Sequence, residues 1–110
     1  MKNMKVFLIL QKQLEELHQQ NKILSASIQR IEQKQWFPLF TVIGGDGAEI
    51  CCSLRVQSEE RVRKGEGVRT WADLRLLAEF MRDKLGIQRC ELILTDFELP
   101  EIGATNENTL

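Results

Sequence analysis

Apolar residues recur at alternating steps of three and four between Phe7 and Gln35, which is the spacing of a coiled-coil heptad. In this register Asn21 occupies a central a position and favours a parallel homodimer, whereas Ile28 followed by Ile31 favours a trimer. We favour the homodimer and keep the trimer as the alternative. The pattern predicts a long oligomerisation helix whose seam is formed by Leu10, Leu14, Leu17, Asn21, Leu24, Ile28 and Ile31.

The start of this helix has two interpretations. Residues 6–10 include the β-branched Val6 and Ile9 and the aromatic Phe7, which suit a short strand. We favour the first turns of the helix, because Phe7 and Leu10 continue the heptad. Replacing Asn21 with Leu is then expected to raise thermal stability and to loosen oligomer specificity, because Asn at a central a position costs stability.

The predicted helix ends before Pro38, because proline disfavours helical geometry in the residue before it. Residues 39–43 and 50–56 have strand-forming compositions, and the glycine-rich segment 44–47 between them predicts an antiparallel hairpin. The second strand alternates between a dry face, with Cys52 and Leu54, and a wet face, with Cys51 and Ser53.

A second helix is predicted over residues 71–85. Thr70 fits its N-cap, Asp73 completes a capping box and Gly86 fits its C-terminal cap. Residues 87–95 then have the pattern of a strand, and the short link before them predicts that the helix packs across one face of the sheet. The apolar stripe of this helix is formed by Trp71, Leu74, Leu77, Ala78, Met81 and Leu85.

These elements predict an α+β protein in which a long N-terminal coiled-coil helix is followed by a small ββαβ module, with an antiparallel hairpin and a helix packed on the sheet. The predicted parts are the oligomerisation helix, 1–35, the α/β module, 36–100, and a flexible acidic tail, 101–110. A domain of about 60 residues buries only about 60% of its unfolded surface. Oligomerisation is therefore expected to contribute to stability.

Charge is unevenly distributed along the chain, although the formal net charge is only -1. A basic loop, residues 55–75, is a candidate site for nucleic-acid phosphates. Glutamates interrupt it and no aromatic residue lies between Arg61 and Arg69 for base stacking, which weakens this hypothesis. The basic set consists of Arg55, Arg61, Arg63, Lys64, Arg69 and Arg75.

Residues suited to catalysis or metal binding are few. The single histidine, His18, falls on the flank of the predicted coiled coil, where a half-exposed structural residue is expected rather than a general base. Cys51, Cys52 and Cys90 lack metal-ligand spacing and predict buried thiols in a reducing compartment. We expect no metal, cofactor or enzyme activity. The apolar run 6–10 is too short for a signal peptide or a membrane span, so a cytoplasmic location is expected.

Two functions follow from these patterns. The heptad predicts a non-enzymatic homo-oligomeric adaptor or assembly protein that presents paired α/β modules on a coiled coil to a protein partner, whose identity the sequence does not reveal. The alternative is a small dimeric nucleic-acid-binding regulator that uses the basic loop 55–75.

Overall fold

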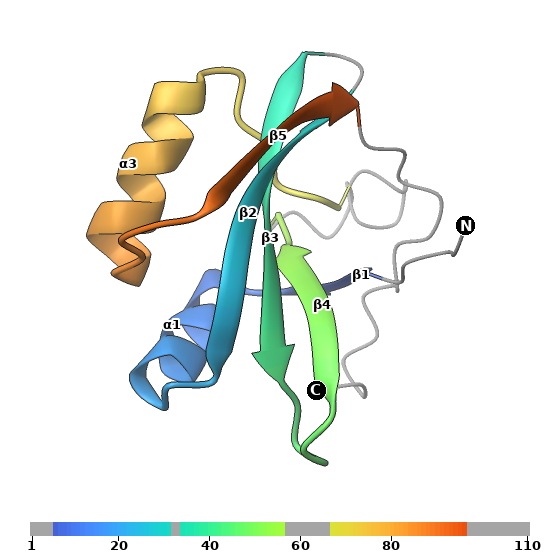
Figure 1. Cartoon of the computed structure of the whole chain (residues 1–110), viewed down its shortest axis with the longest axis vertical. Coiled ribbons are helices and arrows are strands. Elements are labelled where there is room, and N and C mark those ends of the chain that lie inside the picture. The colour runs from blue at the N-terminus through green and yellow to red at the C-terminus, as the bar shows by residue number, and fades with distance from the viewer. Residues whose placement is uncertain (1–5, 32–33, 57–66, 97–110) are drawn as a thin grey trace.

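The computed structural model describes residues 6–31, 34–56 and 67–96. It has an α+β fold in which five strands form one mixed sheet in the order β1-β4-β3-β2-β5 (Figure 1). Neighbours among β2, β3 and β4 are antiparallel, whereas β1 runs parallel to β4 and β5 runs parallel to β2. The elements are β1 (Val6–Ile9), α1 (Gln11–Gln19), β2 (Ile23–Ile31), β3 (Gln35–Ile43), β4 (Glu49–Leu54), α3 (Leu74–Leu85) and β5 (Glu91–Asp96).

The prediction of a long N-terminal helix is wrong. Residues 6–10, interpreted above as helix, begin with strand β1, and the short helix α1 ends at Gln19. Asn21 has a φ of 60°, in the left-handed region, and turns the chain into β2. That strand contains three isoleucines and two serines, residue types that are poor helix formers. Its pairing with β3 outweighs the heptad spacing.

The residues of the predicted coiled-coil seam occupy unrelated environments. Leu10 is the N-cap of α1, Leu14 is fully buried and Leu17 is half-buried against the same core. Ile28 and Ile31 lie on opposite faces of the sheet, because an odd separation on a strand reverses the side of the side chain. The exposed members of the seam are Asn21 and Leu24.

Because the backbone of Asn21 is left-handed, replacing Asn21 with Leu is now expected to lower stability rather than to raise it. Asn21→Leu should lower the free energy of unfolding by about 1–2 kcal/mol, because a left-handed conformation brings the Cβ of an L residue close to the following carbonyl oxygen. Asn21→Gly should change it by less than about 0.5 kcal/mol, because glycine adopts this conformation readily. Urea unfolding of the three proteins measures both effects. A gain in stability for Asn21→Leu would contradict the turn.

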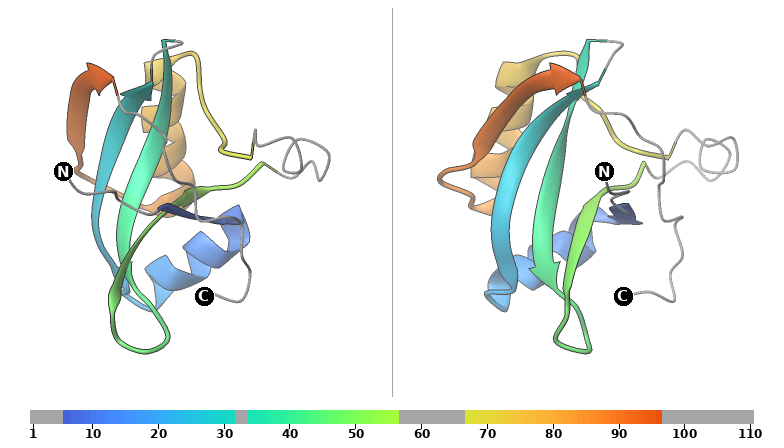
Figure 2. Two further views of the ribbon diagram at one scale, coloured as in Figure 1. Left: turned by 90° about the vertical axis from the view of Figure 1, so that its right-hand side faces the viewer. Right: turned by 45° about the vertical axis from the view of Figure 1, so that its right-hand side comes forward.

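Helices α1 and α3 cover the same face of the sheet (Figures 1 and 2). Leu14 of α1 and Leu77 of α3 pack there with Phe40 and Cys52 of the central strands. This helix-side core consists of Ile9, Leu14, Ile28, Phe40, Val42, Cys52, Leu54, Leu77, Met81 and Leu85. The buried cluster on the opposite face consists of Val6, Leu8, Ile31, Phe37 and Leu39.

The elements predicted after Pro38 are present, with shifted boundaries and a different partner for the last strand. β3 and β4 form the predicted antiparallel hairpin. β5, however, pairs with β2, which lies outside the predicted module, and Arg30 and Asp96 form an ion pair between these strands. Because one sheet joins both halves of the chain, the ββαβ unit is not separate from the N-terminal segment. The predicted tail, 101–110, lies outside the described residues.

The second helix, α3, begins later than predicted and ends where predicted. Its N-cap is Asp73, whose side chain accepts a hydrogen bond from the backbone of Arg75, whereas the Thr70 hydroxyl donates to Gln35. Gly86 is the C-cap, with a φ of 69°. A Cβ at this position would lie 2.7 Å from Nε2 of His18, so the glycine also permits the close approach of the two helices.

The face of β4 that was predicted to be exposed to solvent is partly buried. Ser53 is fully buried, and its hydroxyl donates a hydrogen bond of 2.5 Å to the carbonyl oxygen of Pro38. This bond satisfies the hydroxyl that burial would otherwise leave without a partner. Neither helix of the described residues is long and apolar enough to span a membrane.

Candidate functional site

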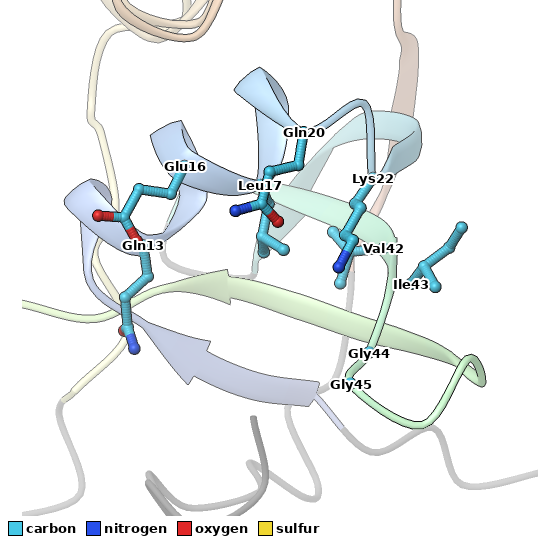
Figure 3. Close-up of a pocket in the computed structure, with 9 residues that line it drawn as sticks. All are labelled: Gln13, Glu16, Leu17, Gln20, Lys22, Val42, Ile43, Gly44 and Gly45. Carbon is cyan, nitrogen blue, oxygen red and sulfur yellow. The ribbon is translucent and has the colours of Figure 1, made fainter.

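A groove lies between α1 and the turn that joins β3 to β4 (Figure 3). It encloses about 230 Å³. Leu17 gives it an apolar centre above the fully buried Val42, and polar side chains surround it. The residues of this α1 groove are Gln13, Glu16, Leu17, Gln20, Lys22, Val42, Ile43, Gly44 and Gly45.

Local backbone structure positions the polar side chains of the groove. Gln13, Glu16 and Gln20 are spaced by three and four residues, so they project from one side of α1. The turn after α1 then brings Lys22 to the groove. Its N–H donates to the carbonyl oxygen of Leu17 at 2.9 Å, and its carbonyl oxygen accepts from the N–H of Ile43 at 3.0 Å. The backbone of Lys22 is therefore hydrogen-bonded to α1 on one side of the groove and to β3 on the other.

The side-chain amide of Gln13 uses its oxygen in a hydrogen bond within the protein, whereas its NH2 group is available as a donor. Its side-chain Oε1 accepts a hydrogen bond of 2.9 Å from the N–H of Leu10, as in a capping box. Because this bond uses only the carbonyl oxygen of the amide, the NH2 group can donate to a bound molecule. The α1 groove thus offers an amide donor together with an apolar surface.

A larger hollow of about 600 Å³ lies on the sheet face opposite the helices. The paired residues Ser25, Thr41 and Cys51 cross this face on β2, β3 and β4. Arg89 and Glu91 lie at its edge. Its lining mixes hydroxyl groups and charges with apolar side chains, among them Leu24 and Leu39.

The cysteines lack the features of catalytic nucleophiles. The prediction of buried thiols is correct for Cys52 only, because Cys51 is half-buried and Cys90 is exposed. Burial, together with the neighbouring Cys51, raises the pKa of Cys52 to about 12, and partial burial raises the pKa of Cys51 and Cys90. Reactive cysteines have lowered pKa values, because the thiolate is the nucleophile. Within the described residues no group of three or more His, Cys, Asp or Glu could hold a metal ion.

Arg69, from the predicted basic set, is a packing residue in the fold. Its guanidinium lies over the rings of Trp71, at 4.6 Å, and Phe80, at 4.9 Å. One of its nitrogens also donates to the side-chain oxygen of Gln11 at 3.2 Å. Trp71 in turn exchanges two backbone hydrogen bonds with Trp36 of β3. Arg69 therefore ties the segment before α3 to both helices.

The other members of the basic set do not complete a phosphate site in the described residues. Arg55 is half-buried, and Arg75 is exposed with a guanidinium nitrogen 3.9 Å from the carboxylate of Asp73. The remaining three, Arg61, Arg63 and Lys64, lie outside the described residues. Nucleic-acid binding by the basic loop stays a prediction.

Neither similarity nor sequence pattern identifies the α1 groove. Comparisons with protein-family models, with curated proteins and with solved structures found no match. In the heptad interpretation Gln13, Glu16 and Gln20 lay outside the a and d seam of a long helix, with Gln13 and Gln20 at the flanking g positions. The polar spacing on α1 was a visible signal, but the opposing wall comes from residues 42–45, and only the folded chain brings the two together.

Proposed function

We propose that this protein is a non-enzymatic adaptor that binds a protein partner through the α1 groove. The observation that supports this is the size of the groove with its apolar centre and polar rim. Its volume of about 230 Å³ is below the ~300–1,000 Å³ of pockets that enclose whole small molecules. It suits one or two side chains of a partner, and an apolar centre with a polar rim is typical of protein interfaces.

The cysteines bear on the location and on the chemistry that we propose. The cysteines form no disulfide bond, which agrees with a cytoplasmic location. Their raised pKa values do not support thiol catalysis. Homodimerisation stays a prediction, but the coiled-coil helix on which it was based is absent, and paired presentation is not part of this proposal.

Selection from a phage-displayed library of random peptides tests the proposed function. We expect enriched peptides to bind the wild-type chain with micromolar affinity and to lose binding when the groove is obstructed. Gly45→Phe adds a ring at the groove where a Cβ meets no atom within 4 Å, so the fold should tolerate it. Gln20→Trp obstructs the groove from the opposite wall.

The matched control is Gly45→Ala, which changes the same residue without filling the groove and should bind the peptides normally. Circular dichroism and thermal unfolding establish that all variants are folded. Failure to enrich any peptide would refute the proposed function. Peptides that bind the obstructed variants as well as the wild type would place the binding surface elsewhere and would also refute it.

A further inference from the structure

Glu16 and Lys22 place opposite charges at the two ends of the α1 groove. In Figure 3, Glu16 lies beside Gln13 at one end, and Lys22 lies toward Gly44 at the other. Leu17 is between them and points toward the sheet. A bound segment that follows the groove would therefore meet a negative charge, an apolar surface and a positive charge in turn.

Neither charge is neutralised within the described residues. Glu16 and Lys22 form no ion pair or side-chain hydrogen bond there, whereas the neighbouring Glu15 accepts a hydrogen bond of 2.8 Å from Gln11. Lys22 is also half-buried. Its attraction for an anion is stronger there than in open water, because the protein lowers the local dielectric constant. Both groups are available to a ligand.

We infer that the partner segment carries an aliphatic side chain between an acidic and a basic group. The acidic group pairs with Lys22, the basic group pairs with Glu16, and the aliphatic side chain contacts the half-buried Leu17. This inference rests on the proposed function and specifies the chemistry of its ligand. Ion pairs at a rim are weak, so each should change affinity by about 2- to 5-fold. Their main effect is to select and orient the segment.

Fluorescein-labelled peptides in which a single leucine is flanked by two charges test this inference. One peptide carries an acidic and a basic residue, a second two basic residues, a third two acidic residues and a fourth two serines, with the spacing to the leucine varied in each. Fluorescence anisotropy at low and high salt measures their affinities for the wild type, Lys22→Glu and Glu16→Lys.

Each protein should prefer a different peptide. The wild type should bind the mixed-charge peptide best, Lys22→Glu should prefer the peptide with two basic residues, and Glu16→Lys the peptide with two acidic residues. High salt should reduce these preferences, because exposed ion pairs are screened. As controls, Lys12→Glu and Glu79→Lys reverse exposed charges outside the α1 groove and should leave the wild-type order unchanged.

The inference and the proposed function fail in distinguishable ways. An identical order of affinities for the wild type and both groove variants would overturn the charge inference. If the serine peptide then binds as well as the mixed-charge peptide, and Gly45→Phe abolishes that binding, the groove still binds peptides and the proposed function stands. If no peptide from this set or from the phage library binds the wild type, both fail.

Discussion

Leu14→Ala is expected to lower the free energy of unfolding by about 2–5 kcal/mol, the range for leucine-to-alanine changes in a protein core. Leu14 is fully buried between α1, the sheet and α3, where it contacts the helix-side core. Truncating it removes apolar burial and leaves a cavity that the rigid central strands cannot fill. Urea unfolding monitored by circular dichroism measures the loss.

Leu24→Ala is the matched control, because the same substitution is made at a second residue of the predicted heptad. Leu24 is 47% exposed on β2, so its truncation should cost less than about 1 kcal/mol. A coiled coil would instead lose comparable stability at both positions, since both contribute to the seam. Equal losses of stability in Leu14→Ala and Leu24→Ala would therefore contradict the sheet and favour the heptad helix.

Arg69→Ala is expected to lower the free energy of unfolding by about 1–3 kcal/mol. The change removes the stacking of the guanidinium on Trp71 and Phe80 and its hydrogen bond to Gln11. Cation–π contacts contribute about 0.5–2 kcal/mol according to their burial, and a hydrogen bond about 0.5–1.5 kcal/mol. The near-UV circular dichroism of the tryptophans should weaken as well, because the Trp71 ring loses a packing partner.

Two further substitutions separate packing from charge at this position. Arg69→Lys keeps the positive charge but not the planar group that stacks on the rings, so it should recover only part of the loss. Arg75→Ala removes a charge from an exposed side chain and should change stability by less than about 0.5 kcal/mol. Full recovery with lysine would mean that charge, rather than stacking, is the contribution of Arg69.

The α1 groove shows the limit of prediction from sequence for a binding site. The spacing of Gln13, Glu16 and Gln20 is visible in the chain, and so is the glycine-rich turn at Gly44 and Gly45. Their juxtaposition depends on where α1 ends. The left-handed backbone at Asn21 decides this, because it reverses the chain and brings Lys22 next to Ile43.

By itself, the sequence determined the elements whose signals are local. The glycine-rich turn produced the hairpin of β3 and β4, and the apolar stripe through Leu77, Met81 and Leu85 produced α3 with its cap at Gly86. Such signals act within one turn or one helical face, so they do not depend on distant partners. They were correct to within a few residues.

Tertiary structure decided the N-terminal third and the position of β5. The heptad spacing from Phe7 to Ile31 is compatible with one helix, but the same residues also supply β1, α1 and β2. Strand pairing satisfies the backbone of β2 through β3 and β5, and both helices then bury their apolar faces on one side of the sheet. A lone helix could bury its stripe only against another chain. Burial within the same chain explains why the sheet prevails.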